Sequence, residues 1–181
     1  MAGKVEYCTD CHGPSGQGYQ GYLTMPRLAG QTPEYFDKQL RNFADRSRER
    51  NLFINMARVH GLSSVLRAAL AAHFHGLDPR PIGGGPRSLV DTGKRIYEEG
   101  VPEANIPACA ACHGPDAKGR EAIPRLAGQL YAYIVKELTN WSSGRGQEAA
   151  KDDVSAVMTP IAHALSPAQV SAIAAYLSYL R

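Results

Sequence analysis

Apolar residues recur along this chain at the three- and four-residue spacing of amphipathic helices, without the strict alternation of half-buried strands. One helix is predicted to begin at Thr32-Pro33, where a capping residue precedes a proline suited to the first turn. Its apolar side consists of Tyr35, Phe36, Leu40 and Phe43. The pattern predicts an all-α protein.

The last helix is the most clearly marked element. It is predicted to begin at Ser166-Pro167, where Gln169 completes a capping box. Its apolar stripe consists of Val170, Ile173, Ala174, Leu177 and Leu180. A counterpart from Ser63 to Phe74 carries Leu66, Ala69, Leu70 and His73. In a further predicted helix, Gly93 and Tyr97 share one face.

The chain also repeats itself. Cys8-Thr9-Asp10-Cys11-His12 returns as Cys109-Ala110-Ala111-Cys112-His113, and Gly-Pro follows both copies. Residues 26–31, P-R-L-A-G-Q, return as residues 124–129. Later pairs are Tyr35 and Tyr133, Met56 and Met158, and His60 and His163. This internal duplication indicates two similar units in tandem.

The segment 79–88 separates the two copies. It is rich in proline and glycine, which prevent a continuous helix or a central strand. We therefore expect a first domain at 1–78, a linker at 79–88 and a second domain at 89–181. Each domain is small for a self-sufficient core, and a buried prosthetic group would supply much of its apolar centre.

The repeated C-x-x-C-H motif is typical of covalent c-type haem attachment. Its two thiols form thioethers to the porphyrin vinyl groups, and the adjoining histidine reaches the iron. One helical turn places these groups on the same side of one macrocycle. We therefore expect two covalent haems, attached at Cys8 and Cys11 and at Cys109 and Cys112, with His12 and His113 as iron ligands.

A zinc site built from all four thiolates is the competing interpretation. The chain has no other cysteine, so such a site would use every thiol. Four thiolates would leave the histidine after each pair without a role. The haem interpretation accounts for both histidines.

These motifs together resemble the dihaem cytochromes c4. The resemblance rests on C-x-x-C-H-G-P, P-R-L-A-G-Q, a tyrosine-bearing helix, a methionine and a final helix opening with Leu-Ser, each present twice. It implies two class I cytochrome c folds, His/Met iron ligation and electron transfer in the bacterial periplasm. The cytochrome subunit of flavocytochrome c sulfide dehydrogenase is similar in size and plan.

A second axial ligand can be sought among the methionines. Thioether sulfur opposite histidine raises the potential of a haem. Met158 is the only methionine of the second unit and follows His113 by 45 residues, while Met56 follows His12 by 44. Met25 aligns with Ile123 and is better explained as a packing residue. We expect Met56 and Met158 as the metal ligands.

Four further histidines and two arginines leave alternatives open. His60 and His163 keep a bis-histidine site possible, but a loop histidine near the haem edge or the surface is the preferred interpretation. His73 is expected on a core-facing stripe, and His75 at a solvated helix end. Arg27 and Arg125, both next to proline, either pair with a haem propionate or lie on the surface.

Charge adds little to this picture. The net charge is only +3, and no base-reading motif accompanies it, which disfavours nucleic-acid binding. Basic residues gather at Arg41, Arg46, Arg48 and Arg50. This cluster is expected to be a solvated helix end and loop, or a surface that steers an acidic redox partner.

The function expected from these observations is electron transfer without catalysis. The partners would be redox proteins, such as a quinol-oxidising complex and a terminal oxidase or a periplasmic dehydrogenase. The alternative is an electron-accepting subunit of a dehydrogenase. Neither a signal peptide nor a membrane-length apolar run is recognisable, so we expect a trimmed, exported periplasmic protein. Its partners or a missing N-terminal anchor could associate it with a membrane.

Overall fold

The computed structural model describes residues 1–45, 47–48, 61–144 and 154–181, and within these ranges the regular structure is helical. No sheet forms in the described residues, where strand-like pairing is limited to three isolated bridges. The all-α prediction is confirmed. None of the helices in the described part of the chain has the length and apolar character that a membrane crossing requires.

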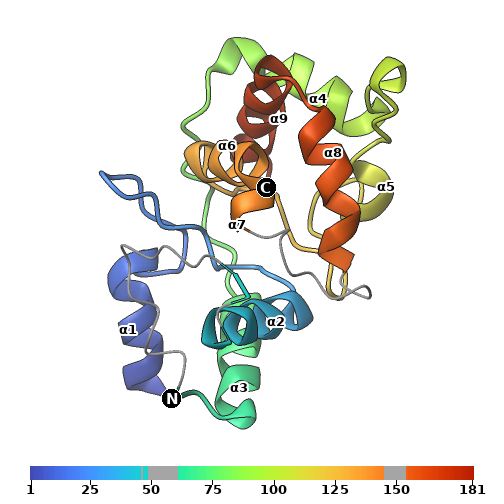
Figure 1. The fold of residues 1–181 in the computed structure, drawn as a ribbon. Helices are drawn as coiled ribbons and strands as arrows, with labels where there is room; N and C mark the ends of the chain where they lie inside the picture. Colours follow the sequence, from blue (N-terminus) through green and yellow to red (C-terminus); the bar gives the residue numbers. More distant parts are fainter. Residues whose placement is uncertain (46, 49–60, 145–153) are drawn as a thin grey trace.

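The described residues of the first unit form three α-helices, which lie in the lower half of Figure 1. They are α1 (Ala2–His12), α2 (Pro33–Ala44) and α3 (Ser64–His75). The predicted helix starts are confirmed, and the Ser63 side chain caps α3 by accepting from the Leu66 N–H. Thr32 occupies the N-cap position of α2, but its buried hydroxyl makes no capping bond.

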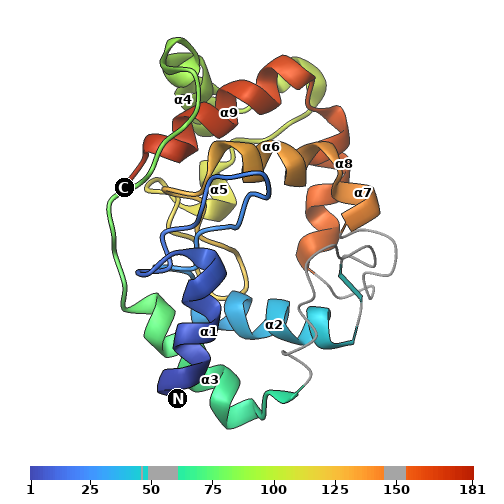
Figure 2. The same ribbon diagram turned by 90° about the vertical axis from the view of Figure 1, so that its left-hand side faces the viewer.

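The second unit lies above the first in Figures 1 and 2. Its elements are η2 (Arg87–Leu89), α4 (Val90–Glu99), η3 (Pro102–Ala104), α5 (Ala110–His113), α6 (Tyr131–Thr139), α7 (Trp141–Gly144), η4 (Val154–Val157), α8 (Met158–Ala164) and α9 (Pro167–Tyr179). The capping box predicted at the start of α9 is present, with Ser166 and Gln169 bonding each other's backbone.

Each unit has its own hydrophobic core. In the first unit, Phe36 and Leu40 of α2 pack against Leu70 and Phe74 of α3, and the Phe36 and Phe74 rings are stacked. The second core is larger and centres on α9, which packs against α4 and α6. The two cores lie on either side of segment 79–88 in sequence. The domain boundaries at 78 and 89 stay a prediction.

Helices α4 and α9 are in close backbone contact at Gly93. A Cβ added to Gly93 would overlap the backbone carbonyl of Ala172 in α9. Tyr97, one turn further along α4, is fully buried against the Tyr176 ring. The predicted Gly93 and Tyr97 face is therefore the contact face of α4.

The linker is fastened to the second unit. Gly85 packs against Ala175 of α9, and the Tyr179 hydroxyl donates to the Gly85 carbonyl over 2.7 Å. From the first unit, the Gln20 amide donates to the Gly83 carbonyl over 2.9 Å. Segment 79–88 lacks a regular element until η2, as its composition predicts, but it is anchored at the buried Gly83 and Gly85.

The two P-R-L-A-G-Q segments form the joint between the units. The Gln129 side chain bonds both polar groups of the Arg27 backbone, accepting from the N–H over 2.8 Å and donating to the carbonyl over 3.1 Å. Gln31 does the same to Arg125, over 2.7 Å and 3.1 Å. The duplication has thus produced a reciprocal interface from one repeated sequence.

Arg48 forms a second bridge between the units. Its guanidinium donates to the Tyr133 hydroxyl over 2.7 Å, to Glu137 over 3.3 Å and to Gln39 over 2.6 Å. Only 5% of Arg48 is exposed. The interpretation of the arginine cluster as a wholly solvated surface is therefore wrong for Arg48, because the opposite unit covers it. Arg41 is exposed and pairs with Asp37 on its own helix.

Gly93→Ala should lower the free energy of unfolding by about 1–3 kcal/mol, because α4 must move away from α9 to admit the methyl group. Chemical denaturation of the haem-loaded protein measures the change. Gly3→Ala is the matched control, since nothing lies within 4 Å of the added Cβ on exposed α1. It should leave stability unchanged or raise it by up to about 1 kcal/mol. Equal effects of the two substitutions would contradict the packing argument.

Candidate haem-binding sites

The first C-x-x-C-H motif forms the end of α1. Cys8, Cys11 and His12 are three and four residues apart, so one side of the helix carries all three. Cys8 is half-buried, Cys11 is exposed and His12 is buried. The His12 Nδ1–H donates to the Pro26 carbonyl over 2.7 Å. This bond fixes the ring and leaves Nε2 as the free nitrogen.

The second motif repeats this arrangement on the short helix α5. Cys109 is half-buried, Cys112 is exposed and His113 is buried. The His113 Nδ1–H donates to the Pro124 carbonyl over 3.0 Å. Both units therefore hold the imidazole through the same nitrogen, with Nδ1 donating to a prolyl carbonyl.

The glycine after each histidine turns the chain away from the helix. Gly13 and Gly114 have φ angles of 82° and 83°, which residues with a Cβ rarely adopt. The loops that follow are tied in the same way: the Gly18 and Gly119 amides donate to the carbonyls of His12 and His113. The turn brings each prolyl carbonyl back to the histidine of its own unit.

The placement of the thiols argues against the zinc interpretation, because the described residues form no cluster of metal ligands. Burial raises the pKa of Cys8 and raises that of Cys109 to about 11, because the neutral thiol is favoured away from water. No three Cys, His, Asp or Glu side chains gather in a metal-binding group within the described residues, which include every cysteine. A single site of four thiolates is therefore wrong for this fold.

The residues present fit a covalently attached haem. Each site offers two thiols within one helical turn and a buried imidazole whose Nδ1 is held by a prolyl carbonyl. Burial lowers the pKa of His12 and of His113, so both rings are neutral at pH 7. A neutral imidazole is the form that binds iron.

The described residues include only one of the two expected methionine ligands. Met158 is half-buried at the first position of α8. Met56, like His60, lies outside the described residues. Met25 is half-buried, and its backbone pairs with that of Tyr19 in one of the isolated bridges. Met25 directly precedes Pro26, whose carbonyl holds His12.

The described histidines outside the motifs have other contacts. His163 is exposed, and its Nε2 is hydrogen-bonded to the Ser142 hydroxyl. His163 is thus a surface histidine, as one of the expectations has it, but it lies within α8 and not in a loop. His73 is half-buried with its ring edge-on to Phe74. His75 is exposed at the end of α3, where its Nδ1–H donates to the Gln31 carbonyl over 3.0 Å.

Arg27 and Arg125 are not surface arginines, since only 4% and 7% of each is exposed. Both guanidinium groups approach the Asp78 carboxylate, at 3.4 and 3.5 Å, and Arg181 joins them at 3.5 Å. Burial and the charge of Arg125 together lower the pKa of Arg27 to about 10, against the opposing effect of Asp78. A contact with a haem propionate stays a prediction.

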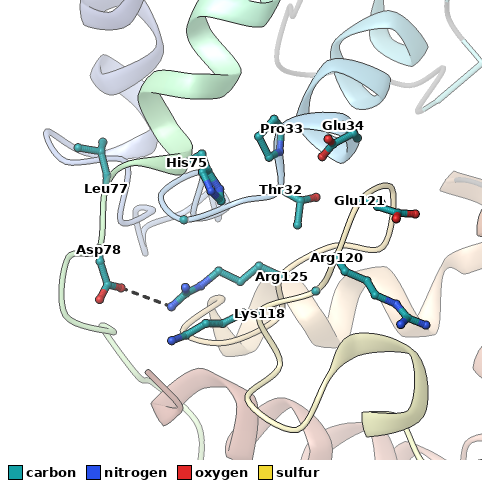
Figure 3. Close-up of a pocket in the computed structure, with 12 residues that line it drawn as sticks. Thr32, Pro33, Glu34, His75, Leu77, Asp78, Lys118, Arg120, Glu121 and Arg125 are labelled. Atoms are coloured by element: carbon teal, nitrogen blue, oxygen red, sulfur yellow. Dashed lines mark hydrogen bonds and ion pairs between the residues drawn. The ribbon is translucent and has the colours of Figure 1, made fainter.

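Figure 3 shows Arg125 reaching Asp78 at a cleft between the units. The cleft has a volume of about 450 Å³, and Thr32 and His75 from the first unit face Lys118 and Arg120 from the second. Its cationic and acidic side chains are nearly balanced, so it selects no particular charge.

The sequence did not reveal the roles of Gln31, Gln129, Arg48 and Asp78. The repeated glutamine was the available signal, because the same polar residue closes both copies of the motif. Nothing in the local sequence identified its partner. The bonded residues are 94 and 102 positions apart.

Two such sites in an all-α chain define a dihaem c-type cytochrome, a class of electron-transfer proteins. Comparisons with known proteins agree. The Cytochrome c family model matches residues 90–181. Cytochrome c4 of Azotobacter vinelandii is 32% identical, over 98% of this chain and 86% of that protein. The "Thiosulfate dehydrogenase electron acceptor" of Thiomonas intermedia is 36% identical, over 94% of this chain and 77% of that protein.

A solved structure extends the likeness to three dimensions. Cytochrome c4 of Acidithiobacillus ferrooxidans is 36% identical, with a TM-score of 0.80 over 97% of this chain and 99% of that one. The chain belongs to the cytochrome c4 family. It is a dihaem electron-transfer cytochrome with two class I cytochrome c folds, and it carries two covalent c-type haems.

The attachment chemistry predicts that denaturation releases no haem. A haem assay on mature protein should give two haems per chain, because each C-x-x-C-H motif provides two thioether bonds. After extraction with acidified organic solvent, the haem should remain attached to the polypeptide. Cys109→Ala with Cys112→Ala should reduce the count to one. Haem in the organic phase would contradict covalent attachment.

Proposed function

We propose that His12 and His113 supply one iron ligand in each unit through Nε2, and that the adjoining cysteines form the thioethers. The Nδ1–H bond to a prolyl carbonyl, present in both units, carries this proposal. It holds the imidazole in one tautomer and one orientation. Bound haem supplies a one-electron iron couple, and these residues fix its ligand field and attachment.

Met158 and Met56 are the second ligands in this proposal. The position of Met158 at the start of α8, half-buried, supports its role. Met56 is supported by its spacing from His12, which differs by one residue from that of Met158 from His113. Met25 is disfavoured because it aligns with Ile123, so the second unit has no sulfur at this position.

Two ligands per iron make the protein an electron carrier that turns over no small substrate. The carrier exchanges electrons with redox proteins, for which we propose a quinol-oxidising complex as donor and a terminal oxidase as acceptor. The site of action is the bacterial periplasm, because covalent haem attachment takes place outside the cytoplasm. Arg41, exposed on α2, contributes to steering acidic partners.

A second candidate function is that of an electron-accepting partner of a dehydrogenase. It is favoured by the relative named as an electron acceptor of thiosulfate dehydrogenase. In this role the chain accepts electrons and leaves substrate oxidation to its partner. A flavoprotein dehydrogenase that oxidises sulfide is another partner of the same kind.

The methionine assignments predict that each substitution removes the sulfur-to-iron absorption band of one haem only. Met158→Ala should abolish the near-infrared sulfur-to-iron band of one haem and open that iron to cyanide. Met56→Ala should do the same to the other haem. Met25→Leu is the control and should leave both bands intact. Loss of a band in Met25→Leu would show that the ligand of the first unit has been misassigned.

Carrier and enzyme differ in what the isolated chain does. It should be reduced quickly by a redox protein donor and oxidised by a terminal oxidase, at rates that fall with salt where charge steers docking. It should not turn over peroxide, sulfide or thiosulfate. Turnover of any of these by the isolated chain would refute the carrier proposal. Tight copurification with a dehydrogenase would favour the second candidate.

A further inference from the structure

Two peptide groups connect the units to the haem sites. The Pro26–Arg27 peptide accepts from the His12 Nδ1–H through its carbonyl, over 2.7 Å, and donates to Gln129 Oε1 through its N–H, over 2.8 Å. Gln129 belongs to the opposite unit. A single planar peptide group therefore links the histidine of one unit to a side chain of the other.

The second unit has the equivalent arrangement. The Pro124–Arg125 peptide accepts from the His113 Nδ1–H over 3.0 Å and donates to Gln31 Oε1 over 2.7 Å. In each unit, a chain of hydrogen bonds therefore runs from the histidine, through one peptide group, to a glutamine of the opposite unit.

Both glutamines are buried and held in one orientation. Only 8% of Gln31 and 7% of Gln129 is exposed. Each Oε1 also accepts from the next backbone N–H of its own chain segment, at Thr32 and Leu130, over 3.0 and 2.9 Å. Each Nε2 donates to the opposite arginine carbonyl. The amide oxygen therefore faces the peptide N–H in both units.

Hydrogen bonds in series strengthen one another in a low-dielectric interior. An acceptor on a peptide N–H makes the carbonyl of that peptide more basic, and a more basic carbonyl strengthens the bond from the histidine Nδ1–H. A stronger bond makes the imidazole a more electron-donating ligand, which favours the ferric state and lowers the reduction potential.

We propose that Gln31 and Gln129 are positioning residues that lower the reduction potential of the haem in the opposite unit. Gln129 acts on the first haem and Gln31 on the second. The reduction potential of each haem then depends on the contact of its unit with the other unit. The inference rests on the proposed ligation by His12 and His113.

The test exploits this crossed arrangement. Gln129→Leu should raise the midpoint potential of the first haem and leave the second unchanged, and Gln31→Leu should do the reverse. At the wild-type midpoint, the oxidised-to-reduced ratio of the affected haem should fall by about threefold, equivalent to about 28 mV at 59 mV per tenfold. Spectroelectrochemical titration measures both potentials, and Met158→Ala identifies the wave of the second unit.

Gln129→Asn is a second variant that keeps a polar amide but withdraws the oxygen by one methylene group. It should give a smaller shift in the same haem. In reduced protein, the His12 Nδ1–H proton resonance should move upfield in both variants, and the His113 resonance should stay. A role confined to interface packing would not move one histidine proton and spare the other.

Tyr133→Phe is the matched control. It removes the hydroxyl that accepts from Arg48 across the same interface but leaves both glutamine pairs intact. Both potentials should remain at the wild-type values. A shift of both haems in Gln129→Leu, a shift of the second haem alone, or no shift would overturn the inference.

Failure of the inference and failure of the proposed function can be told apart. Unchanged potentials in variants that keep two His/Met spectra overturn only the coupling through glutamine. Wild-type spectra without two His/Met signatures overturn the proposed ligation itself.

Discussion

The hydrogen bond from a buried histidine to a prolyl carbonyl is the constraint on which the rest of this structure depends. It requires the helix to end at once, which Gly13 and Gly114 permit by adopting a positive φ. It requires the following loop to return to the histidine, which backbone bonds within each loop secure. With Nδ1 engaged, only Nε2 remains to bind a metal.

The same prolyl peptide also determines how the duplicated units meet. Residues 26–31 and 124–129 place a prolyl carbonyl beside the histidine of their own unit and a glutamine beside the backbone of the other. Buried polar groups are costly unless they are paired, and here the glutamines satisfy backbone groups that the joint would otherwise leave unpaired. Duplication of one short motif therefore supplies both the ligand support and the interface.

The buried charges at the interface are likewise paired with partners from both units or from the segment between them. Arg27 and Arg125 are buried close together, and the Asp78 carboxylate, which pairs with both, offsets part of their mutual repulsion. Arg48 is covered by the opposite unit and bonds Tyr133 and Glu137. A buried guanidinium needs several oriented acceptors, which ties these residues to one relative placement of the units.

The sequence by itself determined the local features of this protein. Helix starts at Pro33 and Pro167, the capping box at Ser166 and the C-x-x-C-H geometry depend on residues a few positions apart, so spacing and residue type predict them. Only the tertiary structure decided the partners of Gln129 and Arg48, which lie 102 and 85 positions away. No local pattern encodes such a distance, because the packing of the two units alone brings these groups together.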